Sequence, residues 1–136
     1  MSLIQTIAVF VATASFALVL GVPKRALVFC ASIGTLGYIV SKLAIFLGIS
    51  ATGGVFLAAS TVGVISEVLA RSLKMPATVF ITAGIIPLAP GAMAYYAMLY
   101  FSKGAHLEAL SATLGVVYIA SAISAGLILG TLLRRR

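Results

Sequence analysis

The chain has 136 residues, of which 62% are hydrophobic and 8% are charged, and its mean hydropathy is +1.25. Because soluble domains carry about 25% charged residues, this composition excludes a water-soluble fold and indicates one integral membrane domain, residues 1–136, with no room for a soluble catalytic domain. The net charge of +7 does not indicate nucleic-acid binding, because the basic residues stand in small groups between apolar runs.

The first apolar run, residues 3–22, is predicted to span the membrane. The residues before it lack the basic region of a signal peptide, so we expect this run to remain in the protein. Each apolar run is close to the roughly 20 residues that a helical span needs, and their continuity excludes a barrel of alternating strands. The sequence therefore predicts an all-α integral membrane protein with five transmembrane helices. The four further runs are about 26–48, 51–70, 77–101 and 109–133.

The charges between these runs predict the orientation of the helices, because basic residues gather on the cytoplasmic side. With the N-terminus outside, seven of the nine basic residues face inside and two stay outside. A re-entrant hairpin at 77–101 would change this to five against four, so an N-out, C-in arrangement with a true fifth span is expected. The inner residues are Lys24, Arg25, Arg71, Lys74, Arg134, Arg135 and Arg136, and the outer ones are Lys42 and Lys103.

Small residues recur at helical spacing on three of the predicted helices. Such faces let helix backbones approach closely, either within the chain or against a partner subunit, and the sequence leaves both hypotheses open. Cys30 is the only cysteine, so an intrachain disulfide is impossible and a buried, inert thiol is expected. The faces are Cys30, Gly34, Gly37 and Ser41; Ala59 and Gly63; and Ala122, Gly126 and Gly130.

The stretch AGIIPLAPGAMAYYAM interrupts the fourth predicted helix. Pro87 and Pro90 lack the N–H that a helix needs, and each displaces the residue before it from the helical region. With Gly91 directly after them, the pattern predicts a break rather than a gentle bend. The two pieces, about 77–86 and 90–102, have similar lengths, so the break at PLAPG is expected near the middle of the bilayer.

A broken helix at this depth is tolerated only inside protein or beside water, and it is a recurring site for transporter substrates. The carbonyls of Ala83 and Ile86 are expected to be free, and so able to accept from an ammonium group. Pro90 at the first turn of the second piece would leave N–H groups near Gly91 for a carboxylate. Together the two helix ends would suit an amino-acid zwitterion. The alternative is a structural kink whose freed groups are satisfied by neighbouring helices.

Polar side chains stand on both sides of the predicted break. Tyr95 or Tyr96 could donate a hydrogen bond to a substrate carboxylate, although both also suit plain packing. Tyr100 is expected at the membrane interface. Thr78 and Thr82 are one helical turn apart and are expected to bond back to their own backbone.

Charged residues also lie within the predicted spans. Glu67 and Arg71 are four residues apart, which suits either an ion pair at the cytoplasmic boundary or, for Glu67, an acid that couples transport to protons. Lys42 lies some turns inside the second span, where it could snorkel or attract a substrate anion. Because Lys42 and Glu67 differ in expected depth by roughly 17 Å, the two cannot pair directly.

The sequence contains no recognisable arrangement of catalytic residues. His106 beside Glu108 in the outer loop does not make a metal site, and there is no nucleophile–base pair, phosphate-binding loop or pair of cysteines. We therefore expect neither an enzyme nor a bound cofactor.

Two long stretches resemble the C-terminal membrane module of the threonine/serine exporter family. They are GVPKRALVFCASIGTLGY and EVLARSLKMPATVFITAGIIPLAPGAMAYYAM, and the most specific pieces are the VPxRAL turn and the IIPLxPG break. The resemblance covers nearly the whole chain. In some members of that family this module is a separate small subunit.

The resemblance implies a membrane subunit of a proton-driven secondary exporter in the bacterial inner membrane. Its substrates would be threonine and serine, or dicarboxylates such as succinate. Its partner would be a larger subunit with a complementary five-span module and a soluble N-terminal region.

Two alternatives remain: a homo-oligomeric channel whose pore is lined by the small-residue faces, and an assembly subunit that does not itself transport. The expected substrate contacts are Ala83, Ile86, Pro87, Pro90, Gly91, Tyr95, Tyr96 and Lys42, and the expected coupling acid is Glu67.

Overall fold

A computed structural model describes residues 3–135, with side chains through Leu133. Arg136 and the side chains of Arg134 and Arg135, which the orientation prediction used, lie outside the described residues. Every regular element of the described residues is a helix, and these residues contain no strand. Its elements are α1 (Leu3–Val19), α2 (Lys24–Phe46), α3 (Ala51–Leu73), α4 (Ala77–Ile85), the 3₁₀ helix η1 (Ile86–Leu88), α5 (Gly91–Ser102) and α6 (His106–Arg135).

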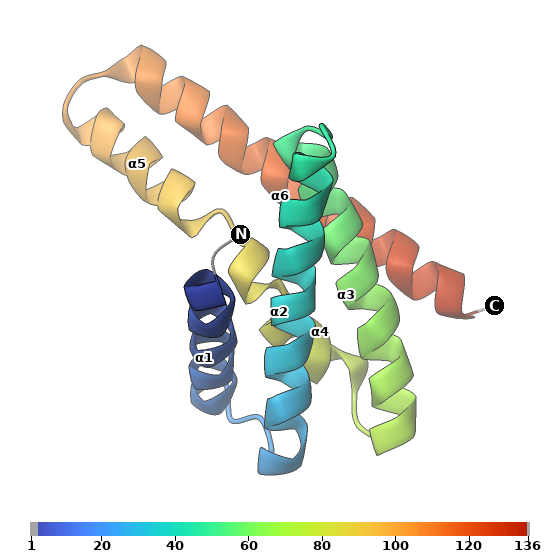
Figure 1. The fold of residues 1–136 in the computed structure, drawn as a ribbon. Helices are drawn as coiled ribbons and strands as arrows, with labels where there is room; N and C mark the ends of the chain where they lie inside the picture. The colour runs from blue at the N-terminus through green and yellow to red at the C-terminus, as the bar shows by residue number, and fades with distance from the viewer. Residues whose placement is uncertain (1–2, 136) are drawn as a thin grey trace.

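The helices form a bundle with a projecting hairpin (Figure 1). In the bundle, α2 lies at the centre and contacts α1, α3 and α4. The long helix α6 runs obliquely across α3, and its first half continues past the bundle and packs on α5. The core is built around α2, α3 and α4, and its largest fully buried side chain is Phe80 of α4.

The helix ends follow turn chemistry more closely than they follow hydropathy. Helix α1 ends at Val19, three residues before the predicted end, because Gly21 adopts a positive φ of 71° and Pro23 cannot continue a helix. Helix α3 continues to Leu73 instead of 70 and ends where Lys74 takes the left-handed conformation. Its charged residues therefore lie within the helix.

The expectation of five spans is met only in part. Within residues 3–135, three helices are long and apolar enough to cross a membrane: Lys24–Phe46, Ala51–Leu73 and His106–Leu133. The bent pair Ala77–Leu88 and Gly91–Ser102 makes a fourth if the two count as one span. Helix α1 is apolar but has only 17 residues, which is shorter than the run predicted from hydropathy. The structure thus gives three or four candidate spans.

The small-residue face of α6 packs within the chain. A β-carbon added at Gly126 would lie 2.5 Å from the Phe56 carbonyl oxygen and 2.9 Å from Ala59 Cβ. Gly130 approaches the Ser60 carbonyl in the same way. The backbones of α3 and α6 therefore touch directly, as small-residue faces allow.

The small-residue face of α2 is also buried inside the chain. A β-carbon at Gly37 would lie 2.8 Å from Val62 Cγ2, and one at Gly34 would lie 2.7 Å from Thr13 Cγ2. Cys30 is fully buried beneath them, as expected. Of the two hypotheses for these faces, packing within the chain is the one that the structure confirms.

Candidate functional site

The predicted break in the fourth helix is present. Helix α4 ends at Ile85, η1 adds one 3₁₀ turn, and Ala89 is extended with φ −62° and ψ 136°. Pro90, with φ −80° and ψ 49°, forms a tight inverse turn in which the Gly91 N–H donates to the Ala89 carbonyl at 2.9 Å. Helix α5 then leaves at 54° to the direction of the first piece.

The prediction that the break leaves free carbonyls is wrong. The N–H of Ile86 donates to the Ala83 carbonyl, and the N–H of Ala89 donates to the Ile86 carbonyl at 3.2 Å and to the Ile85 carbonyl at 3.1 Å. In a regular helix each of these carbonyls would accept from the N–H group four residues later, and the prolines lack that N–H group. In the 3₁₀ turn each carbonyl accepts instead from the N–H group three residues later, which the sequence pattern does not reveal. Each carbonyl keeps one lone pair for another donor.

The start of the second piece also differs from expectation. Helix α5 begins at Gly91, and Pro90 stands just before it as the capping residue instead of occupying the first turn. The Gly91 N–H is used by the tight turn, and the Pro90 carbonyl accepts from Ala94 at 3.0 Å. The next N–H groups, those of Ala92 and Met93, have no acceptor within residues 3–135. They are the backbone donors that this helix end offers to a carboxylate.

One side of the break is buried and the other is open. Pro87 Cγ lies 3.3 Å from the β-carbon position of Gly34, and Leu88 is buried against Gly37. In contrast, Ala89 and Gly91 are exposed. Protein contacts therefore cover the non-helical backbone on one side, and the other side leaves room for a ligand.

Three tyrosines lie on α5, and all three are exposed. Tyr95 and Tyr96 are 64% and 51% exposed, and their ring centroids lie 5.7 Å apart in an edge-to-face pair. Tyr100 stacks on Tyr96 at 6.3 Å. No residue of α5 is buried, so the described chain does not enclose these rings in packing. Their hydroxyl groups are available to a substrate or to a partner.

Lys42 lines a pocket of about 380 Å³ between the start of α1 and the end of α2. Gln5, Leu43 and Phe46 complete the lining. The Lys42 ammonium lies 5.7 Å from the centroid of the Tyr38 ring, which favours a cation there. Lys42 is exposed and stands one turn before the end of α2, so it lies nearer the end of the bundle than the sequence suggested.

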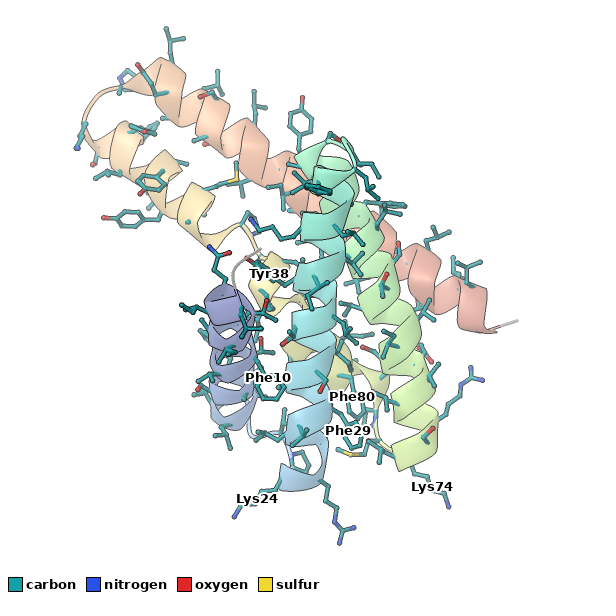
Figure 2. All side chains as sticks on the ribbon, in the orientation of Figure 1. Phe10, Lys24, Phe29, Tyr38, Lys74 and Phe80 are labelled. Atoms are coloured by element: carbon teal, nitrogen blue, oxygen red, sulfur yellow. The ribbon has the colours of Figure 1, made fainter. Side chains whose placement is uncertain are left out.

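Glu67 is half-buried on α3, within the last two turns of the helix. Its neighbour Ser66 is fully buried, and the Ser66 hydroxyl has no hydrogen-bond partner in the described part of the chain. Lys74, which follows α3, and Lys24, which begins α2, lie at the same end of the molecule (Figure 2). The acid therefore lies toward the end of the bundle that carries these lysines.

A family model described as threonine/serine exporter, ThrE, matches residues 5–133. The chain belongs to this family. The match takes in every candidate residue described above, from the break to Lys42 and Glu67. Its members are exporters, so the ThrE assignment places this chain among multi-pass membrane transport proteins. No solved structure matches the chain.

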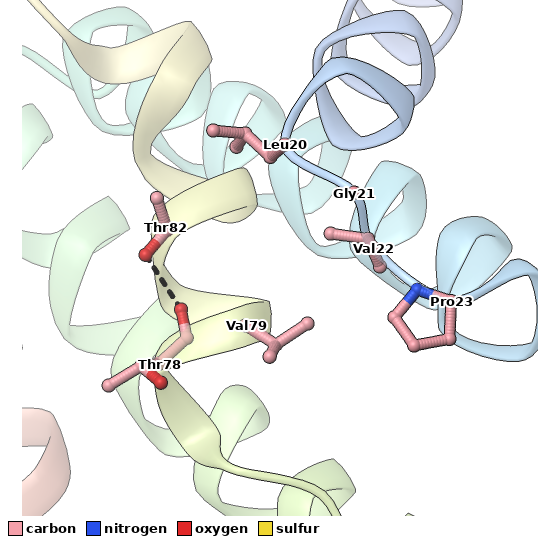
Figure 3. A pocket seen from close by; sticks show the side chains of 7 residues that line it. All are labelled: Leu20, Gly21, Val22, Pro23, Thr78, Val79 and Thr82. Atoms are coloured by element: carbon pink, nitrogen blue, oxygen red, sulfur yellow. Dashed lines mark hydrogen bonds between the residues drawn. The ribbon is translucent and has the colours of Figure 1, made fainter.

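One feature of this ThrE family chain escaped the sequence reasoning. The turn between α1 and α2 and the exposed face of α4 enclose a pocket of about 240 Å³ (Figure 3). Thr78 and Thr82 line it on the α4 side, and the Thr82 hydroxyl donates to the Thr78 carbonyl at 2.7 Å, as the sequence predicted. The sequence shows the VPxRAL turn and the threonine pair as separate local patterns. Only the fold shows that they face each other.

His106 lies in the first turn of α6, after the loop that was predicted to face outside. Among the described residues, no group of three His, Cys, Asp or Glu side chains is placed to hold a metal ion. The His106 ring instead packs edge-to-face on Phe101, with centroids 5.6 Å apart.

Proposed function

We propose that this chain is one membrane subunit of a secondary exporter that carries threonine and serine across the bacterial inner membrane. The observation that carries this proposal is the match to the ThrE family model over residues 5–133. The proton gradient would supply the energy, and a larger subunit would supply the second half of the transport path.

The proposed topology has five spans with the N-terminus outside and the C-terminus inside. Helix α1 supports this count because it packs along α2, and its 17 residues reach the lower limit of about 17 for a span. The 54° bend supports a broken fourth span, because a re-entrant hairpin would nearly reverse the chain. The shared end of Lys24 and Lys74 supports a basic inner face.

The proposed substrate site lies on the open side of the break. A carboxylate would bind the free N–H groups at the start of α5, next to Gly91 and Pro90, where the helix dipole is positive. An ammonium group would use the remaining lone pair of the Ile86 carbonyl, whose usual helical donor is missing because residue 90 is proline, whereas the Ala83 carbonyl belongs to a fully buried residue of α4 and is not reached from this side. Tyr95 or Tyr96 would add a hydroxyl donor from the exposed face of α5.

Glu67 is the proposed proton-coupling acid. Acidic residues within membrane spans are rare and are functional candidates by default. The half-buried position of Glu67 supports this role, because it allows a proton to reach the side chain while protein surrounds it.

The exposed hairpin supports the proposed partner. Lipid tails offer no acceptor for a tyrosine hydroxyl, and the exposed rings of Tyr95 and Tyr96 place two such groups on α5. A complementary five-span module of opposite orientation would cover this face and would place the break at the interface between two inverted halves.

A dicarboxylate such as succinate is the second candidate substrate. The observation that favours it is the pocket at Lys42, where an exposed ammonium group and the Gln5 amide line one hollow. A second carboxylate would need such a cation, because the two helix ends of the break are matched by a zwitterion alone.

The channel alternative is weakened by the packing of the small-residue faces. Helix α3 occupies the space beside Gly126 and Gly130. Side chains of α1, α3 and η1 occupy the space beside Gly34 and Gly37. These faces therefore cannot line a pore between copies of the chain. The assembly-subunit alternative predicts that the larger partner transports by itself.

The test is efflux from proteoliposomes loaded with serine, threonine or succinate, with and without an imposed proton gradient. This chain alone is compared with this chain together with its larger partner. Efflux that needs both subunits and the gradient is the expected result. Efflux from this chain alone would overturn the two-subunit proposal, and efflux from the partner alone would favour an assembly role.

A further inference from the structure

The pocket between the α1–α2 turn and α4 lies at the basic end of the bundle. The turn immediately precedes Lys24, which marks that end together with Lys74. Under the proposed topology this end faces the cytoplasm, which is where an exporter loads its substrate. The lining residues are Leu20, Gly21, Val22, Pro23, Thr78, Val79 and Thr82.

The turn wall of the pocket is built by the folded-back end of α1. The N–H of Gly21 donates to the Leu18 carbonyl at 3.0 Å, and that of Val22 donates to the Ala17 carbonyl at 3.0 Å. These bonds use the N–H groups of the turn, so the turn offers few donors to a ligand. Gly21 holds its positive φ without a side chain in the opening.

The α4 wall of the pocket offers hydrogen-bond acceptors. The Thr82 hydroxyl donates its one proton to the Thr78 carbonyl (Figure 3), so the oxygen of this pocket-lining residue remains an acceptor. Thr78 and Thr82 are both exposed, and all seven lining residues are uncharged. The Thr82 oxygen therefore suits a ligand group that donates hydrogen bonds, as an ammonium group does, and the Thr78 hydroxyl remains able to donate to a second group of the ligand.

The pocket and the break lie on one continuous side of α4. Thr82 precedes Ile86 by four residues, which is about one helical turn or 6 Å. Helix α1 packs mainly on α2 and contacts α4 only lightly, so α1 closes this side weakly. A ligand at the threonines would stand one turn from the break without crossing the buried core.

We propose that this pocket is the cytoplasmic opening of the substrate path and that Thr82 receives the ammonium group of serine or threonine there. The inference rests on the proposed function. It adds the place where the substrate first binds and a preference for amino acids over dicarboxylates. The preference follows from hydrogen-bond chemistry, because an ionised dicarboxylate carries acceptors and no donor.

The first test is the reactivity of a cysteine placed at Thr82. Cys30 is the only cysteine of this chain and is buried, so Cys30→Ala removes the one thiol of the chain, and the transporter with Cys30→Ala alone gives the background labelling. Thr82→Cys in that background, in inside-out membrane vesicles containing the whole transporter, should react with a charged, membrane-impermeant thiol reagent. Added serine should slow the reaction, and added succinate should not.

A matched control is Thr61→Cys in the same background. Thr61 has the same bond back to its helix, from its hydroxyl to the Leu57 carbonyl at 2.9 Å, but it lies on α3 away from the pocket. It should show no protection by serine. An unreactive Thr82→Cys, or one protected equally by serine and succinate, would overturn the inference.

The second test measures transport kinetics in substitutions at Thr82 that preserve the fold. Thr82→Val keeps the shape and removes the hydroxyl, so the KM for serine should rise about tenfold or more, because a hydrogen bond to a charged group is lost. Thr82→Ser should keep the wild-type KM. Equal KM values for Thr82→Val and Thr82→Ser would remove the proposed contact.

Serine efflux from the unmodified transporter is measured in parallel and keeps the two proposals apart. Efflux together with an unprotected cysteine at Thr82 would overturn the loading pocket and leave the exporter proposal standing. Serine protection without any efflux would overturn the exporter proposal and would retain the pocket as a binding site.

Discussion

Gly34 of α2 and Pro87 of η1 are in direct contact: a β-carbon at Gly34 would stand 3.3 Å from Pro87 Cγ. The same position would lie 2.7 Å from Thr13 Cγ2, so three segments of the chain meet at one glycine. The break is thus seated against α1 and α2, and its position depends on the absence of a side chain at residue 34.

Gly34→Ala should therefore destabilise the protein. Thr13 is buried and its hydroxyl is bonded to the Val9 carbonyl at 2.8 Å, so it cannot easily move away from the added methyl group. Overpacking of this kind costs about 1–3 kcal/mol, and a lower Tm in detergent should report it. Gly91→Ala is the control, because nothing lies within 4 Å of its β-carbon position. Equal Tm values for the two variants would contradict the seating of the break.

Replacing Pro87 and Pro90 together by Ala should abolish serine transport. Alanines restore the N–H donors of a regular helix, so α4 and α5 would tend to straighten and the N–H groups at the start of α5 would be consumed. Serine efflux measures the loss, and co-purification with the larger subunit checks that assembly persists. Wild-type efflux from the double variant would rule out the break as the substrate site.

Glu67→Gln should uncouple transport from the proton gradient. The amide keeps the shape of the side chain but does not exchange protons, so serine exchange should persist while gradient-driven efflux is lost. Both fluxes can be followed with labelled serine in the same vesicles. Glu108→Gln, at the exposed start of α6, is the control and should retain both. Gradient-driven efflux at the wild-type rate in Glu67→Gln would assign coupling to another residue.

Lys42→Ala should reduce succinate efflux and leave serine efflux unchanged. The variant removes the cation that a second carboxylate would need, whereas a zwitterion requires only the helix ends of the break. Lys103→Ala, in the exposed turn before α6, serves as the control for a general loss of positive charge. An equal loss for both substrates in Lys42→Ala would remove this distinction.

The sequence predicted those parts of the fold that depend on local chemistry. Two prolines three residues apart prohibit a regular helix in any surroundings, so the break at Pro87 and Pro90 could be placed correctly. The end of α1 was misplaced because hydropathy continues through Leu20 and Val22 while the backbone already turns at Gly21. Turn residues were the better guide at that point.

The sequence could not decide what depends on tertiary contacts. Small residues at Gly126 and Gly130 allow close packing, but only the fold shows that α3 supplies the neighbour. The Ala83 carbonyl was expected to be free because a proline removes one donor, yet a 3₁₀ turn supplies another. The pocket at Thr82 joins two segments about sixty residues apart, and no local pattern connects them.

The continuity of α6 has a mechanical consequence. Its second half is fixed to α3 at Gly126, whereas its first half, starting at His106, extends beyond the bundle with α5. An unbroken helix of this kind acts as a lever with its pivot at the glycine contact. Because about twenty residues separate the pivot from the free end, a rotation of about 10° would move that end by about 5 Å. A small change in packing against α3 would then be felt at α5, and so at the mouth of the break.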